Sequence, residues 1–265
     1  MQNSKEVKEI VKEKYSQIAK NGQSGCGCGC GSSSIIDNYI IMKDKYDHLD
    51  GYIAEADLGL GCGLPTQYAG IKEGDTVVDL GSGAGNDVFV ARAIVGDKGI
   101  VIGIDMTEEM IERAKKNNQK LGYQNVEFKL GDIERIPLNN GIADVVVSNC
   151  VLNLVPDKQK AFAEIFRILK KGGHFCVSDI VIKGELPANV KKSAEMYAGC
   201  VAGAAQQDEY LKIIEEAGFK NIEMNKTKVI NLPDKILKNN LGEEEIKIFR
   251  EYKTGIFSIT VTAYK

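Results

Sequence analysis

Short runs of β-branched and aliphatic residues alternate with amphipathic stretches from Thr76 onward. Short runs of this kind between helical segments are typical of strands in a parallel sheet that is covered on both faces. The predicted strands are 76–80, 100–104, 126–130, 143–148 and 174–180, and the clearest helices between them are 108–121 and 158–169. Gly172 and Gly173 are expected to stop the second of these helices. The pattern predicts an α/β fold with a doubly wound parallel sheet.

Further elements flank this alternating region. Apolar side chains of residues 4–20 fall on one stripe at helical spacing, which predicts an amphipathic helix. Tyr15 on this stripe could cover a cleft or pack the helix down, and we favour packing. Residues 208–217 predict another helix, and residues 257–264 alternate like a closing strand.

These elements divide the chain into three parts. The first contains the N-terminal helix, a Cys-Gly loop and a cap, the second is a cofactor-binding core, and the third combines a substrate-binding insertion with closing strands and C-terminal elements. We expect their bounds at 1–70, 71–183 and 184–265.

The charge balance argues against nucleic acid and membrane partners. The 265 residues include 34 Lys and Arg against 37 Asp and Glu, so no net positive field attracts phosphate groups. Neither a secretory leader nor an apolar run of about 20 residues is visible. We therefore expect a cytoplasmic protein whose seven cysteines are reduced and used for metal binding or chemistry.

A glycine-rich turn follows the first predicted strand. Gly81, Gly83 and Gly85 come directly after the buried run and before a helical segment. This arrangement lets a ligand approach the backbone at the carboxyl edge of the sheet. A nicotinamide-binding turn has its third glycine three positions after the second, whereas position 86 is Asn. The spacing therefore disfavours NAD.

Acidic residues end the second and third predicted strands. Asp105 stands where a carboxylate can accept hydrogen bonds from two ribose hydroxyls. Asp132 could accept from an adenine amino group, while Met106 and Ile133 supply apolar surface for the ring. Together these features predict a ligand that contains adenosine but no pyrophosphate.

On these residues the sequence resembles the class I S-adenosylmethionine-dependent methyltransferases. The resemblance rests on Asp-Leu-Gly-Ser-Gly-Ala-Gly at 79–85, Gly-Ile-Asp at 103–105 and Gly-Asp at 131–132. It implies S-adenosylmethionine as cofactor and a seven-stranded sheet whose last strand is antiparallel, with an N-terminal helix and a small C-terminal addition. The residues expected to bind the cofactor are Asp79, Gly81, Ser82, Gly83, Asn86, Asp105, Met106, Asp132, Ile133 and Asn149.

Three single cysteines, Cys62, Cys150 and Cys200, stand far apart along the chain. A structural zinc site usually has four ligands and a tight Cys-x-x-Cys pair, and the sequence has no such pair. His48 and His174 give no ligand spacing either. Three thiolates suit a soft centre such as trivalent arsenic, whose lone pair could attack a methyl group without a general base.

Longer motifs resemble the arsenite methyltransferases across most of the chain. They are Leu-Gly-Cys-Gly-Leu-Pro at 60–65, Gly-Ile-Asp-Met-Thr-Glu-Glu-Met at 103–110, Ser-Asn-Cys-Val-Leu-Asn-Leu at 148–154 followed by Asp-Lys at 157–158, and Gly-Cys-Val-Ala-Gly at 199–203. The resemblance implies that Cys62, Cys150 and Cys200 bind arsenic, supplied as arsenite or its thiol conjugates.

The same resemblance implies a further N-terminal cysteine in a disulfide relay. Cys26, Cys28 and Cys30 are all candidates for this thiol. Because methyl transfer oxidises arsenic, a thiol reductant of the thioredoxin or glutathione type must return it to the trivalent state. Thioredoxin is thus an expected partner.

Two other functions remain open at this point. The chain could methylate an organic small molecule in a pocket lined by cysteines, or it could sequester a soft ion without catalysis. A cysteine at the end of a parallel strand is often a small buried hydrophobic residue, and we interpret Cys176 in this way.

Overall fold

The computed structural model describes residues 4–21, 44–184, 203–230, 238, 242–244, 246–247 and 255–265. Its helices are α1 (Ser4–Asn21), α3 (Pro65–Tyr68), α4 (Asn86–Val95), α5 (Glu108–Leu121), the short η1 (Leu152–Leu154), α6 (Lys158–Ile168) and α9 (Gln207–Glu216). Its strands are β1 (Thr76–Leu80), β2 (Ile100–Asp105), β3 (Val126–Leu130), β4 (Ala143–Asn149), β5 (Leu169–Lys183), β6 (Ala205–Gln206), β7 (Lys220–Ile230) and β8 (Gly255–Tyr264).

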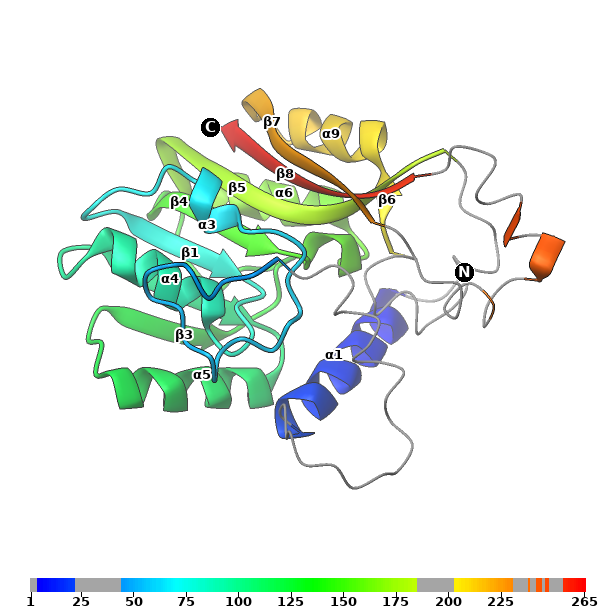
Figure 1. The fold of residues 1–265 in the computed structure, drawn as a ribbon. Coiled ribbons are helices and arrows are strands. Elements are labelled where there is room, and N and C mark those ends of the chain that lie inside the picture. The colour runs from blue at the N-terminus through cyan, green and yellow to red at the C-terminus, as the bar shows by residue number, and fades with distance from the viewer. Residues whose placement is uncertain are drawn as a thin grey trace.

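Within the described residues these strands form one sheet in the order β3-β2-β1-β4-β5-β8-β7, and the two-residue β6 pairs with β5 beside this path. The strands from β3 to β5 are parallel to their neighbours. β8 runs antiparallel to both β5 and β7. Figure 1 shows the sheet between helices on both sides. The predicted α/β, doubly wound sheet of seven strands with an antiparallel last strand is confirmed, and β6 is a short addition to it.

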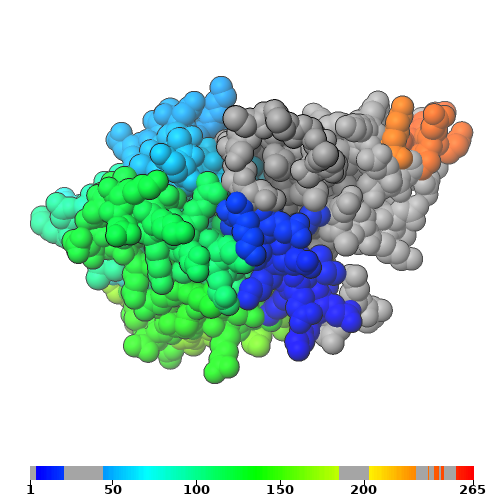
Figure 2. Space-filling view, turned by 90° about the horizontal axis from the view of Figure 1, so that it is seen from below, coloured from blue at the N-terminus to red at the C-terminus, as the bar shows by residue number. Residues whose placement is uncertain are grey.

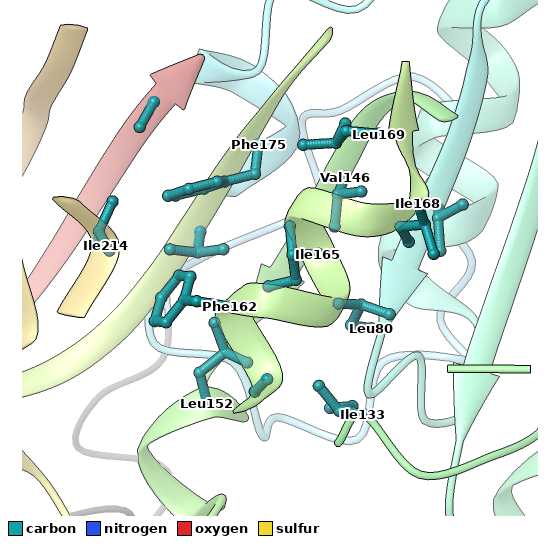
Figure 3. Packing of buried hydrophobic residues seen from close by; sticks show 14 of the residues in the cluster. Leu80, Ile133, Val146, Leu152, Phe162, Ile165, Ile168, Leu169, Phe175 and Ile214 are labelled. Atoms are coloured by element: carbon teal, nitrogen blue, oxygen red, sulfur yellow. The ribbon is translucent and has the colours of Figure 1, made fainter. Parts of the chain in front are cut away.

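Successive residues of the central strands alternate between two hydrophobic layers. Val77 of β1 belongs to a cluster that includes Phe89 of α4 and residues of α5. The next residue, Val78, belongs to the opposite cluster, which contains Phe162 of α6 and residues of α9. Figure 3 shows this second layer, in which the α6 side chains point toward Leu80 and Phe175 of the sheet. Burial on both faces explains the nearly continuous apolar runs that the sequence shows.

The glycine pair at 172–173 does not end helix α6, contrary to the prediction. The helix ends at Ile168 because Leu169 already has an extended backbone and begins β5. Leu169 pairs with Ala143, but the next paired residues are His174 and Val145, so the strand bulges between them. The two glycines therefore lie inside β5 at this irregularity, where a flexible backbone is required.

Strand β7 is absent from the predicted elements. It covers Lys220–Ile230 and forms the edge of the sheet beyond β8. Most of its side chains are exposed, and its sequence is polar and rich in Lys. An edge strand of this composition resists pairing with other chains, and its lack of an apolar pattern hides it from sequence analysis.

Helix α1 docks on the core through charged contacts at one end of the sheet. Lys8 forms ion pairs with Asp132 (2.6 Å) and Glu134 (2.8 Å), both in the segment after β3. About two helical turns further along α1, the Ser16 hydroxyl donates to Glu109 at the start of α5 (2.8 Å). Figure 2 shows α1, in dark blue, lying directly against the green surface of the core. The helix thus reaches the edge where the sequence predicts cofactor binding.

Phe162 should be the most informative single position for testing the larger hydrophobic layer. It is fully buried, and its ring lies 5.6 Å from the rings of both Phe175 and Tyr210. Phe162→Ala should lower the free energy of unfolding by about 3–5 kcal/mol, as other large-to-small core changes do. Urea denaturation followed by circular dichroism measures this change. Ile94→Ala, at a position that is 37% exposed, is the control, and equal effects of the two changes would contradict the packing described.

Candidate active site

A cavity opens at the carboxyl edge of the sheet. The residues directly after β1, β2, β3 and β4 line it, together with three side chains of α1 and the segment before Cys62. Every residue predicted to bind the cofactor lies on its wall, namely Asp79, Gly81, Ser82, Gly83, Asn86, Asp105, Met106, Asp132, Ile133 and Asn149. Cys150 lines it as well. The topology therefore brings the scattered sequence motifs to one place.

The glycine turn shapes the floor of this cavity. Gly81 has a φ of +73°, and a β-carbon there would lie 2.3 Å from Cγ2 of Val151. Gly83 has a φ of +52°, but a β-carbon on it would meet no atom within 4 Å because this part of the turn faces open space. Glycine is thus required at Gly81 by packing, and at Gly83 it leaves the backbone accessible to a ligand.

The carboxylate of Asp105 is held by two backbone N–H groups. Thr107 N donates to Oδ1 at 2.8 Å, and Gly83 N donates to Oδ2 at 3.0 Å. Burial raises the pKa of Asp105, although these hydrogen bonds act in the opposite direction. A carboxylate at the end of this strand is placed to accept hydrogen bonds from a pair of ribose hydroxyls.

Two buried polar atoms in the cavity wall have no hydrogen-bond partner among the described residues. They are Oγ of Ser82 and Oδ1 of Asn86, on the turn and in the first turn of α4. Such atoms are rare in folded proteins because an unmet buried polar group destabilises the fold by about 1–3 kcal/mol. Both residues line the cavity, so a small shift of either side chain would bring these atoms within reach of a polar ligand.

Two carboxylates, Asp79 and Asp87, are buried close together at the inner end of the cavity. Burial raises the pKa of Asp79 well above its ordinary value, and the charges of Asp87 and Asp105 raise it further. Burial also raises the pKa of Asp87 to about 6, although hydrogen bonds from Asn149 and Tyr46 oppose this. A cationic group would stabilise both carboxylates. Sequence analysis missed Asp87, although it directly follows the predicted Asn86.

Asp132 has partners that the sequence did not predict. Its Oδ1 accepts from Glu134 N at 2.9 Å, and its Oδ2 is paired with Lys8 of α1. Tyr15, interpreted from the sequence as a packing residue, also lines the cavity. Helix α1 thus covers the side of the cavity where the adenine ring was expected.

Cys150 follows β4 directly and has an unusual backbone conformation. Its φ is +61°, in the left-handed region that non-glycine residues rarely adopt. Its N–H donates to the carbonyl of Ser178 at 2.7 Å, and the residue is 3% exposed. The conformation turns the chain so that the thiol-bearing residue lies at the cavity wall.

Cys62 is completely buried in the loop that precedes α3. Its N–H donates to Oδ1 of Asn149 at 3.0 Å, and its carbonyl accepts from Oγ of Ser258 at 2.6 Å. Neighbouring residues on the loop, Leu60 and Gly61, line the cavity. Because Asn149 immediately precedes Cys150, one side chain joins the backbones of the two cysteine-bearing segments.

A buried phenol and carboxylate lie near the same two thiols. The Tyr210 hydroxyl donates to Asp179 at 3.0 Å. Burial raises the pKa of Tyr210 well above its ordinary value, and the charges of Asp179, Cys62 and Cys150 raise it further. Both thiols therefore lie within electrostatic range of one hydroxyl group. Burial raises the pKa of Asp179 to about 7. Neither residue belongs to a motif that the sequence could reveal.

The remaining cysteines divide into two groups. Cys176 is fully buried in the α4 and α5 layer, as predicted, and burial raises its pKa to about 12. Cys26, Cys28, Cys30 and Cys200 lie outside the described residues. In the part of the chain that is described, no cluster of three His, Cys, Asp or Glu side chains is arranged to hold a metal ion.

Comparison with known proteins agrees with this geometry. Residues 71–218 match a family described as a methyltransferase domain. The crystal structure of an arsenic(III) S-adenosylmethionine methyltransferase from Chlamydomonas reinhardtii aligns with a TM-score of 0.66 and 31% identity, covering 89% of this chain and 75% of that one. The chain belongs to the arsenite methyltransferase family.

Curated members of this family extend the similarity. The arsenite methyltransferase of Halobacterium salinarum is 41% identical over 229 residues, which cover 83% of this chain and 59% of that protein. The human enzyme is 36% identical over 209 residues, covering 74% of this chain and 55% of that protein. The chain thus matches between half and three fifths of the length of these two family members.

No described helix is both long enough and apolar enough to cross a lipid bilayer.

The cavity fits S-adenosylmethionine, the cofactor that the fold and the family support. Asp105 would bind the ribose hydroxyls, with Met106 and Ile133 beside the adenine. The unpaired atoms of Ser82 and Asn86 would gain polar partners. The buried carboxylates described above would lie near the positive charges that this cofactor carries.

Gly81→Ala tests the shape of the turn. The new methyl group would collide with Val151, and the left-handed backbone adds strain of about 1–3 kcal/mol. We expect the dissociation constant for S-adenosylhomocysteine to rise about tenfold or more, since each 1.4 kcal/mol is a factor of ten. Isothermal titration calorimetry measures it.

Gly122→Ala is a matched control for this change. Gly122 has the same φ of +73°, but a β-carbon there meets no atom within 4 Å, and the residue caps α5 away from the cavity. It should bind S-adenosylhomocysteine normally. Equal affinities for the two variants would show that the turn does not determine cofactor binding.

Proposed function

We propose that this chain transfers a methyl group from S-adenosylmethionine to trivalent arsenic held by the thiolates of Cys62, Cys150 and Cys200. The observation that carries the proposal is the placement of Cys150 on the wall of the cofactor cavity, with Cys62 tied to the preceding residue by a hydrogen bond. The substrate would be arsenite or its thiol conjugates. Family membership supports this acceptor over an organic molecule.

The chemistry of the acceptor explains why the site needs no general base. Arsenic bound by three sulfur atoms keeps a lone pair and carries no proton. When bound, S-adenosylmethionine supplies an electrophilic methyl group on a sulfonium. The arsenic lone pair becomes the new As–C bond while the sulfonium S–C bond breaks and its electrons stay on sulfur. Arsenic is thereby oxidised from the trivalent to the pentavalent state.

The protein's part in this reaction is placement and exclusion of water. Cys62 is completely buried and Cys150 is 3% exposed, so arsenic bound there would be shielded from solvent. The buried carboxylate of Asp179 lies near the phenol that both thiols influence. Burial raises the pKa of Asp179 to about 7, and the charge of Lys158 opposes this rise, so only the ionised form of this carboxylate would favour the positive charge that passes from the donor to arsenic.

A second round of methylation requires that arsenic return to the trivalent state. We propose that one thiol among Cys26, Cys28 and Cys30 takes part in the required disulfide exchange. A dithiol reductant of the thioredoxin type, or glutathione, would supply the two electrons. Such reductants maintain thiols in the cytoplasm, which is where we propose that the chain works.

The decisive assay uses purified protein, S-adenosylmethionine, arsenite and a thiol reductant, with products identified by mass spectrometry. Wild-type protein should form methylated arsenicals. Cys62→Ser, Cys150→Ser and Cys200→Ser should each reduce arsenic turnover to the background rate, because a hydroxyl is a poor ligand for a soft centre. S-adenosylhomocysteine binding should persist in all three variants.

Cys176→Ala is the control, since this thiol lies in the hydrophobic layer outside the cavity. It should retain arsenic turnover. Full turnover in Cys150→Ser would exclude the proposed site. Binding of arsenite without any methylated product in the wild type would instead point to sequestration.

A further inference from the structure

Three side chains, the buried Tyr46 and Asp87 and the partly buried Asn149, form a hydrogen-bonded network between the cofactor cavity and the Cys62 loop. Tyr46, in the segment before α3, donates from its hydroxyl to the carboxylate of Asp87 (2.9 Å to Oδ2). Asn149, at the end of β4, donates through Nδ2 to the Tyr46 oxygen and to the carbonyl of Gly63 (2.9 Å), and the same nitrogen lies 3.2 Å from Oδ2 of Asp87. We name Asp87, Tyr46 and Asn149 the junction.

The junction reaches the backbones of both cysteine-bearing segments. Oδ1 of Asn149 accepts from the N–H groups of Cys62 (3.0 Å) and Gly63 (3.3 Å). Cys150 is the residue after Asn149 in the chain. A shift of the Asn149 side chain would therefore move one cysteine relative to the other.

Close packing leaves the Cys62 loop little freedom to move independently of the junction. A β-carbon on Gly61 would lie 2.7 Å from Nδ2 of Asn149, and one on Gly63 would lie 2.4 Å from Oγ of Ser178. Contacts this short exist only because both residues are glycines. The loop backbone is thus pressed against β4 and β5 on either side of Cys62.

The other end of the junction faces the cofactor. Tyr46, Asp87 and Asn149 all line the cavity together with Asp79. Burial raises the pKa of Tyr46 well above its ordinary value, and the charge of Asp87 raises it further. The phenol therefore stays protonated and continues to donate. The ammonium group that S-adenosylmethionine and S-adenosylhomocysteine share would, if bound beside Asp79 and Asp87, alter the field on the carboxylate that Tyr46 binds.

From these contacts we infer that Tyr46 is a positioning residue, which couples occupancy of the cofactor cavity to the arrangement of Cys62 and Cys150. The inference rests on the proposed function, because it takes trivalent arsenic as the ligand of these thiols. Coupling of this kind is reciprocal, so each ligand should tighten the binding of the other by the same factor. Tyr46 touches neither reacting atom and acts through Asp87 and Asn149.

The test measures arsenite affinity with and without a saturating concentration of S-adenosylhomocysteine, which occupies the cavity but cannot donate a methyl group. Equilibrium dialysis with elemental detection of arsenic gives both dissociation constants. In the wild type, S-adenosylhomocysteine should tighten arsenite binding about fivefold or more, within the usual range of coupling between sites. In Tyr46→Phe this factor should fall clearly below the wild-type value, because only the longer direct contact between Asn149 and Asp87 (3.2 Å) then joins the two ends of the junction.

Three further variants distinguish a loss of coupling from a general loss of stability. Asp87→Asn keeps the shape of the side chain but removes its charge, and it should abolish the coupling. The double variant Tyr46→Phe with Asp87→Asn should lose no more coupling than Asp87→Asn alone. Tyr123→Phe removes a phenolic hydroxyl from a ring packed on Phe89 of α4, outside the cavity, and it should keep the wild-type factor.

The possible outcomes distinguish this inference from the proposed function. If arsenite binds to the wild type through Cys62 and Cys150 but the factor is one, the coupling is wrong while the site stands. If Tyr46→Phe weakens both ligands yet keeps the factor, Tyr46 is merely structural and the inference fails. If arsenite does not bind at all, both are overturned.

Discussion

Burial of the central strands on both faces is the constraint on which the rest of the structure depends. β1, β2 and β4 contribute their apolar side chains to two hydrophobic layers, which leaves little room for polar groups in the middle of the sheet. Most polar and reactive groups of the cavity lie at or just after the carboxyl ends of these strands. Because the strands are parallel, those ends meet at one edge, and the glycine turn, Asp105, Asp132 and Cys150 meet there too.

Most of this arrangement could be predicted from the sequence because it follows from apolar runs and the residues that end them. β1, β3 and α5 have the predicted bounds, and every residue predicted to bind the cofactor lines the cavity. Strand β7 was missed since it is a polar edge strand held by pairing with β8 and not by an apolar face. The bulge in β5 at Gly172 was also missed, because a glycine pair after a helical segment is equally typical of the end of a helix.

The rest of the candidate site arises from tertiary contacts that leave no local pattern. Lys8 reaches Asp132 across 124 positions of sequence, and Tyr46 reaches Asn149 across 103. Tyr210 and Asp179 come from different elements and become partners only when α9 packs on β5. A single tyrosine or aspartate in a sequence does not indicate which distant residue it will contact. A glycine turn after a strand, in contrast, indicates a ligand-binding edge from local sequence alone.

The left-handed backbone at Cys150 affects the free energy with which a ligand would bind at this residue. A non-glycine residue in this conformation carries strain of about 1–3 kcal/mol, which the fold sustains before any ligand arrives. Because the fold already holds the Cys150 backbone in one conformation, binding of the proposed arsenic ligand would cost little backbone entropy at this residue. The free energy needed to hold this backbone conformation is thus supplied when the chain folds and not when a ligand binds.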